Sequence, residues 1–235
     1  MLRRIIVGAS PGIANREGPQ ASLPPMRAPV FVATGQPGEA LPLADAEIRY
    51  WPAAFGHEEA AELFARLRAG IDWRQEEVLI FGQRRPVPRL VAWHGDPGAT
   101  YTYSGTPHVP EPWTPELDRV RDRVQALTGG RFNAVLLNLY RDGRDGMGWH
   151  ADDEPELGRD PAIASVSLGA TRRFSLRHRR RKGSRLDVPL GPGSLLLMSG
   201  PTQHHWLHAV PKTATATGER INLTFRQVGR EVGAR

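Results

Sequence analysis

The second half of the chain is a series of short β-type segments separated by turns rich in glycine and proline. These segments cover residues 132–140, 162–168, 172–177, 194–199, 205–210 and 220–227. A strand–turn–strand unit is also predicted over residues 78–93. Many short strands with tight turns are typical of a sandwich or jelly roll. The 25 glycines and 21 prolines agree with such a turn-rich fold.

Two helices are predicted before this β-rich half. Residues 57–69 carry apolar side chains at helical spacing, and Gly70 follows as a stop. A second helix is predicted to begin after Thr114 as N-cap, with Pro115 in its first turn, and to end before Gly129. Two helices and a β-rich half predict an α+β chain with the helices packed on one sheet.

Residues 1–45 are rich in Pro, Gly and Ala and show little periodicity. We predict that they form a mostly disordered or loosely packed N-terminal extension. No stretch of the chain approaches a membrane span, and the apolar run near the N-terminus is too short for a signal peptide. We therefore expect an intracellular protein with no membrane partner.

The chain has no cysteine, which excludes disulfides, thiolate zinc sites, iron–sulfur clusters and a cysteine nucleophile. A metal would therefore be held by His, Asp or Glu, a ligand set that favours a harder metal. The formal net charge is +6. This balance suits a polyanion such as nucleic acid, although an arginine-rich composition alone would also produce it.

A candidate metal site begins with His150 and Asp152. In a strand, residues i and i+2 point to the same side, so both could reach one metal. A third ligand could come from His204, His205 or His208. Two histidines and one carboxylate on one face leave three positions open, as in non-haem iron(II) oxygenases. The alternative is a surface hydrogen bond between two unrelated side chains.

The segment 220–226 reads as a strand with one polar and one apolar face. Its polar face carries Arg220, Asn222, Thr224 and Arg226. Two arginines directed into a core would be costly without anions, and a dicarboxylate would supply them because guanidinium pairs with carboxylate through two hydrogen bonds. A solvated strand face is the alternative.

Asn138 and Tyr140 share one face of an earlier predicted strand. They could donate hydrogen bonds to the same dicarboxylate, or they could lie on an exposed face. Together with the two patterns above, they make the chain resemble the AlkB family of iron(II)- and 2-oxoglutarate-dependent dioxygenases. The resemblance is to the AlkB homologue two type. It covers residues 78–228 and rests on Asn138-Leu139-Tyr140, His150-x-Asp152, His208 and Arg220-x-Asn222-x-Thr224-Phe225-Arg226.

The resemblance implies a fold and a domain plan. A double-stranded β-helix (jelly-roll) core would occupy residues 111–230, with flanking helices. A helix and an N-terminal nucleotide-recognition lid would lie in residues 46–110. Residues 46–230 would fold as one unit, and the protein would be a monomer.

The resemblance also implies the ligands and the reaction. His150, Asp152 and His208 would bind iron(II), and the required cosubstrates would be 2-oxoglutarate and dioxygen, with ascorbate as activator in vitro. Oxidative demethylation of 1-methyladenine or 3-methylcytosine in DNA would release formaldehyde, succinate and CO2. The residues implied to bind 2-oxoglutarate are Asn138, Tyr140, Arg220, Asn222, Thr224 and Arg226.

An enzyme of this type must flip a base out of the duplex. Phe81 would act as an intercalating wedge, although a core position in a hairpin is the alternative for this residue. Tyr101 and Tyr103 match aromatic residues of the lid, and Asp153 or Glu154 could favour a cationic lesion. The predicted substrate-binding set is Phe81, Gly82, Arg89, Tyr101, Tyr103, Asp153 and Glu154.

Residues 172–185 contain eight Lys or Arg in fourteen positions. Such a segment is predicted to bind phosphates, although a solvated surface is the alternative. The predicted partner is alkylated DNA, double-stranded, with RNA, protein or a non-catalytic nucleic-acid-binding role as alternatives. The protein would act in the cytoplasm, at the nucleoid in a bacterium or in the nucleus of a eukaryote. The predicted contacts to the DNA backbone are Arg177, Arg179, Arg180, Arg181 and Lys182.

Overall fold

The computed structural model describes residues 38–80, 82–99, 101–103 and 106–229. For residues 79, 80, 101–103 and 106–108 it describes the backbone alone. All of these residues belong to one compact unit. Within this part of the chain, no helix is long and apolar enough to cross a membrane.

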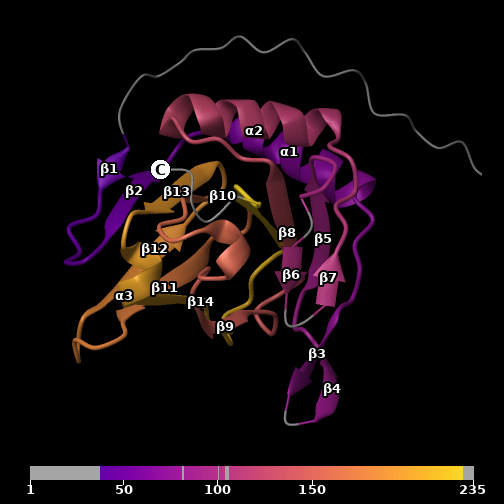
Figure 1. Ribbon diagram of the computed structural model, residues 1–235. Coiled ribbons are helices and arrows are strands. Elements are labelled where there is room, and N and C mark those ends of the chain that lie inside the picture. Colours follow the sequence, from indigo (N-terminus) through magenta and orange to yellow (C-terminus); the bar gives the residue numbers. More distant parts are fainter. Residues whose placement is uncertain (1–37, 81, 100, 104–105, 230–235) are drawn as a thin grey trace, which may run out of the picture. The chain divides into compact units, whose positions relative to one another are not determined.

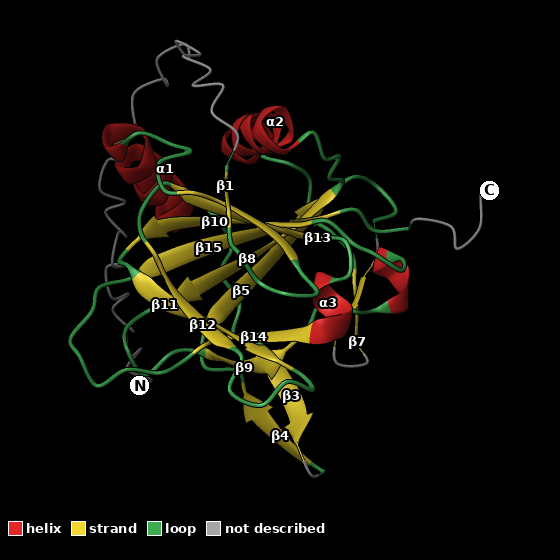
Figure 2. Ribbon diagram, turned by 90° about the vertical axis from the view of Figure 1, so that its left-hand side faces the viewer, coloured by secondary structure: helices red, strands yellow, loops and turns green. Residues whose placement is uncertain are grey.

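Two antiparallel sheets face each other and form the body of the fold (Figures 1 and 2). The smaller has the order β12 (Arg185–Leu190), β11 (Arg172–His178), β14 (Trp206–Val210) and β9 (Met147–His150). This arrangement agrees with the predicted jelly-roll core. The larger sheet has the order β1 (Glu39–Ala40), β2 (Glu47–Trp51), β13 (Ser194–Ser199), β10 (Ile163–Gly169), β15 (Arg220–Arg226), β8 (Ala134–Tyr140) and β5 (Leu90–Gly95).

Both predicted helices are confirmed, and they cover the outer face of the larger sheet (Figure 2). Helix α1 spans His57–Gly70 and α2 spans Pro115–Thr128. The Thr114 side chain caps α2 by accepting a hydrogen bond from the Leu117 N–H at 3.3 Å. Gly129 ends α2 in the left-handed conformation, with φ of 69°. The helices leave the inner face of the larger sheet free for the smaller sheet.

Two hairpins, β3–β4 and β6–β7, stand outside the two sheets. The first joins β3 (Glu77–Ile80) to β4 (Gln83–Pro86), and the second joins β6 (Tyr101–Tyr103) to β7 (Thr106–His108). In both ribbon views β3 lies near β9, at the end of the jelly roll where the smaller sheet has its edge (Figures 1 and 2).

Several sequence expectations differ from the structure. Asp152 does not share a strand with His150, because β9 ends at His150 and the next element is a 3-10 helix, η1 (Pro155–Leu157). The predicted strand 205–210 begins one residue later, after a short helix α3 (Thr202–His205). Strands β1, β2, β6, β7 and β12 were not expected.

The segment that pairs with β2 begins before the boundary predicted at residue 46. Strand β1 pairs with β2 through Glu39 and Ala40, and Leu41 and Leu43 pack against the hydrophobic core. The last residues of the predicted extension are thus part of the folded unit, while residues 1–37 lie outside the described residues.

Candidate metal and dicarboxylate site

Three potential metal ligands meet at the edge of the smaller sheet. His150 ends β9 and pairs with His208 of β14 across the sheet. One ligand atom each from His150, Asp152 and His208 lie within 4.8 Å of one another. The two imidazole rings have centroids 4.2 Å apart. Strand pairing therefore brings together two nitrogen ligands and one carboxylate, a donor set suited to a non-haem iron(II) centre.

Asp152 is held from both sides although it lies in a loop. Its backbone N–H donates to the Gln203 side-chain oxygen at 3.0 Å. Its carboxylate accepts a hydrogen bond from Arg226 at 2.5 Å and lies 3.4 Å from the His208 Nε2. Burial alone would raise the pKa of Asp152, but Arg226 and His208 hold this pKa well below its ordinary value. The carboxylate is therefore charged and ready to bind a cation.

His150 is held as a neutral ligand. Its Nδ1 lies 2.9 Å from the carbonyl oxygen of Gly148, which can only accept, so Nδ1 carries the proton and Nε2 keeps a lone pair. Burial and the neighbouring His208 lower the pKa of His150 to about 3. At neutral pH the imidazole is thus uncharged, as metal coordination requires.

The polar face of β15 lines a cavity next to these ligands. The cavity is lined by every residue predicted to bind 2-oxoglutarate. Strand β10 adds two serines that the sequence reasoning missed. Asn222 donates to the Ser165 hydroxyl and Arg220 to the Ser167 hydroxyl, both at 2.8 Å. The alternation of Ser165 and Ser167 in an apolar segment was the available signal.

Arg220 is a buried cation whose guanidinium could bind an anion in the cavity. The residue is 1% exposed, and its Nε and Nη1 have no hydrogen-bond partner. Burial lowers the pKa of Arg220 to about 10, so the guanidinium remains charged at neutral pH. Two unsatisfied N–H groups on one buried guanidinium fit a carboxylate that accepts two hydrogen bonds. The residues present therefore fit a dicarboxylate whose other end lies near the metal ligands.

Arg89 and Asn138 contact each other beneath the cavity. The Arg89 Nε donates to the Asn138 Oδ1 at 2.7 Å, and both residues are buried. Asn138 was expected at the dicarboxylate and Arg89 at the substrate, so the structure joins these two predicted groups. Tyr140 lies under Arg220, whose guanidinium carbon is 5.2 Å from the ring centroid. Gln203 and Arg172, both buried, were not expected near the site.

The other described residues of the predicted substrate set, apart from Arg89, lie on the two hairpins and on the loop after Asp152. Gly82 lies in the β3–β4 turn with φ of 77°, and Phe81 lies outside the described residues. The structure describes only the backbone of Tyr101 and Tyr103, in β6. Asp153 and Glu154 directly follow Asp152, Asp153 exposed and Glu154 half-buried.

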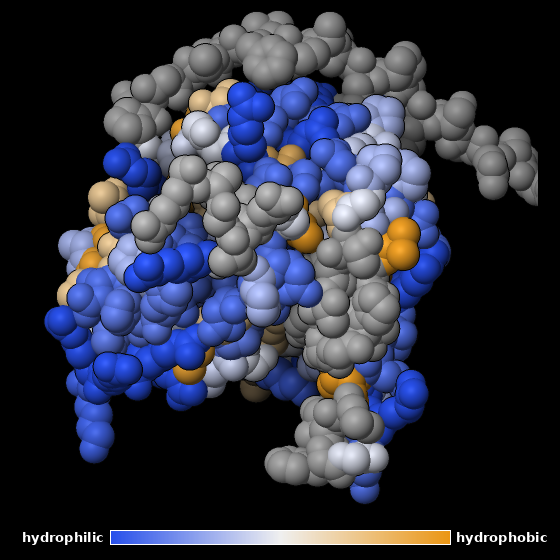
Figure 3. Space-filling view, viewed as in Figure 1, coloured by the Kyte–Doolittle hydropathy of each residue, from blue (hydrophilic) through white to orange (hydrophobic). Residues whose placement is uncertain are grey.

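The predicted phosphate contacts divide into three kinds. Arg179 pairs with Asp153 at 2.7 Å, and Arg181 pairs with Asp45 at 2.8 Å. The Arg177 guanidinium stacks on Trp149, with its central carbon 4.4 Å from the ring centroid. Arg180 and Lys182 are exposed and form no ion pair with any described residue. Figure 3 shows a hydrophilic surface around this β11–β12 turn, at the lower left.

Comparisons with known proteins agree with this geometry. Residues 47–226 match the 2OG-Fe(II) oxygenase superfamily. The chain is 46% identical over 184 residues to the DNA oxidative demethylase ALKBH2 of Bos taurus, which covers 74% of this chain and 66% of that protein. Identity to the Homo sapiens ALKBH2 is 44%, with 74% of this chain and 70% of that protein covered.

Two further likenesses lie at greater distance. The alpha-ketoglutarate-dependent dioxygenase alkB homolog 3 of Rattus norvegicus is 39% identical over 196 residues, or 80% of this chain and 66% of that protein. The solved structure of OsALKBH1 superimposes with a TM-score of 0.56 at 23% identity, over 77% of this chain and 97% of that chain. The chain thus spans about two thirds of the length of these curated relatives, and the solved structure supports the fold.

Proposed function

The chain belongs to the 2OG-Fe(II) oxygenase superfamily and, within it, to the AlkB family, and from this premise we propose that it is a DNA oxidative demethylase. Its substrates would be N-methylated bases such as 1-methyladenine and 3-methylcytosine. The observation that carries the proposal is one cavity lined by the His150, Asp152 and His208 ligands and by Arg220, a buried cation with two unsatisfied N–H groups.

His150, Asp152 and His208 would hold the iron, and Arg220 would bind the far carboxylate of 2-oxoglutarate. When bound, iron(II) would activate dioxygen, and the oxidation of 2-oxoglutarate to succinate and CO2 would accompany conversion of the N-methyl group to a hydroxymethyl group, which leaves as formaldehyde. Arg226 keeps the Asp152 carboxylate oriented and ionised through its hydrogen bond. Apolar side chains of Leu136 and Phe174 line the same cavity and limit water.

The substrate would approach beside β9. The β3–β4 and β6–β7 hairpins form the proposed nucleotide-recognition lid, with Phe81 as the wedge and Tyr101 and Tyr103 as stacking residues. Asp153, next to Asp152, pairs with Arg179 and would favour a cationic base through the exposed part of its carboxylate. The exposed cations of the β11–β12 turn support DNA as the polyanion. The protein would act as a monomer in the compartment that holds the DNA.

The test is incubation of the purified protein with iron(II), 2-oxoglutarate, ascorbate and an oligonucleotide that contains 1-methyladenine. We expect mass loss of one methyl group on double-stranded DNA, with single-stranded DNA and RNA as comparison arms. Asp152→Ala should abolish turnover while DNA binding persists. If no methylated DNA or RNA substrate loses a methyl group, the demethylase proposal is wrong.

A further inference from the structure

The imidazole of His178 occupies the centre of the β11–β12 turn. His178 is the last residue of β11, and its side chain is 3% exposed. The ring stacks on His205 with centroids 5.8 Å apart and contacts the edge of Trp206 at 5.2 Å. None of these three rings belongs to the metal and dicarboxylate cavity. A buried histidine outside that cavity needs its own explanation.

Hydrogen bonds to this ring shape the turn. The His178 Nδ1 accepts from the backbone N–H of Arg180 at 3.1 Å and from that of Arg181 at 2.9 Å. The backbone N–H of His178 donates to the Ser184 carbonyl at 3.0 Å and closes the base of the turn. Since a backbone N–H can only donate, Nδ1 carries no proton. The proton of the neutral ring is then on Nε2, which faces the Asp45 carboxylate at 3.2 Å.

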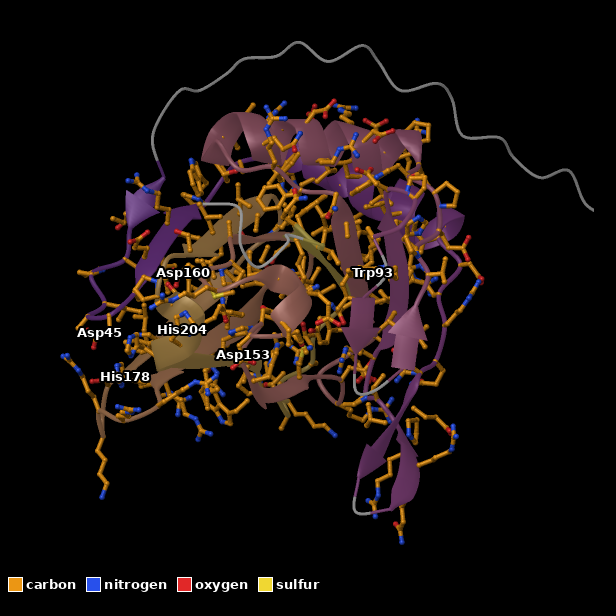
Figure 4. All side chains as sticks on the ribbon, in the orientation of Figure 1. Asp45, Trp93, Asp153, Asp160, His178 and His204 are labelled. Atoms are coloured by element: carbon orange, nitrogen blue, oxygen red, sulfur yellow. The ribbon has the colours of Figure 1, made fainter. Side chains whose placement is uncertain are left out.

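Asp45 links the ring to one of the cations. The carboxylate oxygen that accepts from His178 also pairs with Arg181 at 2.8 Å. Asp45 has φ of 58°, the one positive value among the non-glycine residues that the structure describes. Figure 4 shows Asp45 and His178 next to each other at the lower left, on the side of the turn away from Asp153.

A metal site is the competing explanation for these residues. Ligand atoms of Asp45, His178 and His205 lie within 4.8 Å of one another. A metal on the His178 Nε2 would require the proton on Nδ1, where it would oppose the N–H groups of Arg180 and Arg181. The hydrogen bonds of the turn therefore favour the tautomer that cannot bind a metal at Nε2.

We propose that His178 is a positioning residue that holds the β11–β12 turn in the shape in which Arg180 and Lys182 contact DNA phosphates; this inference rests on the proposed function. Arg179 is fixed to Asp153 on one side of the turn, and Arg181 to Asp45 on the other. Arg180 lies between these two anchors in the sequence and Lys182 follows the second, and both are exposed. Fixed backbone N–H groups reduce the entropy that the turn would lose on binding.

Two substitutions at His178 separate the roles of its two nitrogens. In His178→Asn the side-chain oxygen can take the place of Nδ1 and accept from the turn, whereas the contact to Asp45 is lost. In His178→Gln the terminal amide can take the place of Nε2 and donate to Asp45, whereas the turn loses its acceptor. The probes are an unmodified duplex for binding and a 1-methyladenine duplex for turnover.

We expect His178→Gln to raise the Kd for the unmodified duplex about 5- to 10-fold and to reduce the salt slope of binding by about 1. The KM for the methylated duplex should rise by a similar factor with kcat unchanged, and His178→Asn should restore both values to within about 2-fold of the parent. If His178→Gln binds and reacts like the parent, or if kcat falls and KM does not change, the inference is wrong.

Asp45→Gly tests the inference if His178→Gln does not fold. Glycine adopts the positive φ without strain, so this variant removes the carboxylate and little else. We expect the Kd to rise by no more than about 2-fold, as in His178→Asn, because the Nδ1 acceptor of the turn remains; a rise of 5-fold or more contradicts the inference. Loss of DNA binding by the parent after chelation, with recovery in zinc alone, would support the metal site instead. Duplex binding can be measured without turnover. A parent protein that binds DNA but shows no demethylation would therefore contradict the proposed function, while the binding test of His178 would still be valid.

Discussion

The dicarboxylate cavity and the β11–β12 turn are both rich in arginine, but the two regions hold these charges differently. In the cavity, Arg220 is buried and keeps two N–H groups without partners. In the turn, Arg179 and Arg181 are exposed and already paired with Asp153 and Asp45. A ligand carboxylate in the cavity thus satisfies a cation that water cannot reach. A phosphate at the turn replaces water or an existing partner, so each contact contributes less and is weakened by salt.

The largest effect is expected from Arg220→Met. The affinity for 2-oxoglutarate should fall about 100-fold or more, because a buried charge pair contributes about 2–5 kcal/mol. Arg220→Lys keeps the charge and loses the fork-shaped pair of donors, so its affinity for 2-oxoglutarate should lie between those of Arg220→Met and the parent. Calorimetric titration with 2-oxoglutarate and the KM for 2-oxoglutarate measure both. The free energy of unfolding without ligand should not decrease in Arg220→Met, since an unpaired buried cation is removed. Equal affinity for 2-oxoglutarate in Arg220→Met and the parent would show that Arg220 does not bind this ligand.

A smaller effect, on the affinity for duplex DNA, is expected at the turn, where substitutions of Arg180 and Arg179 can be compared directly. Arg180→Ala should weaken duplex binding about 5-fold and reduce the salt slope by about 1, because this cation has no described ion-pair partner. Arg179→Ala should weaken binding less, because the charge of Arg179 is already offset by Asp153. Fluorescence anisotropy at several salt concentrations measures both variants. A larger loss in Arg179→Ala would mean that DNA binding breaks the Arg179–Asp153 pair.

The smallest effect on catalysis is expected from Asp145→Asn, near the cavity but outside it. Burial raises the pKa of Asp145, but hydrogen bonds from the Arg141 side chain and backbone lower it by more, so the pKa lies below its ordinary value. A carboxyl of this kind stabilises the fold above its unfolded pKa and loses that contribution as the pH falls through its folded pKa. The substitution should lower the free energy of unfolding by about 1–2 kcal/mol at pH 7.

Urea unfolding at two pH values provides the control for Asp145→Asn. The difference from the parent should be complete at pH 7 and should shrink below about pH 4. The KM for 2-oxoglutarate should stay unchanged, in contrast to Arg220→Met. A difference in stability that grows toward acid would show that Asp145 is not stabilised as a carboxylate.

The sequence predicts the buried region better than the turn, for a physical reason. The alternation of Arg220, Asn222, Thr224 and Arg226 predicted their common face, because side chains of a strand alternate strictly. Asp152 lies at the predicted site, but the predicted reason was wrong. A hydrogen bond from the Asp152 backbone N–H to the Gln203 side chain holds the residue there, and strand geometry does not. No local pattern marks Gln203, which lies 51 residues away in sequence.

At the turn, the sequence predicted a group of cations but not their partners. Asp45 lies in the segment expected to be a loose extension, and it meets Arg181 only because β1 and β2 close the sheet on that side. Asp153 was expected to contact the substrate, and its ion pair with Arg179 was not predicted. These pairs depend on loops brought together by the fold, which have no fixed spacing along the chain.

Strand β15 also limits which changes of chain length the family can accept here. It carries Arg220 at one end and Arg226 at the other. Its register is continuous with β8 from Arg220 to Arg226 and with β10 from Arg220 to Phe225. A deletion of one residue within β15 would turn one of the two arginines to the opposite face and shorten the span between them by about 3.3 Å. Insertions in the β11–β12 turn would leave that span untouched. We therefore expect lineages of this enzyme to diversify by gaining or losing residues at the β11–β12 turn, while β15 changes by substitution alone.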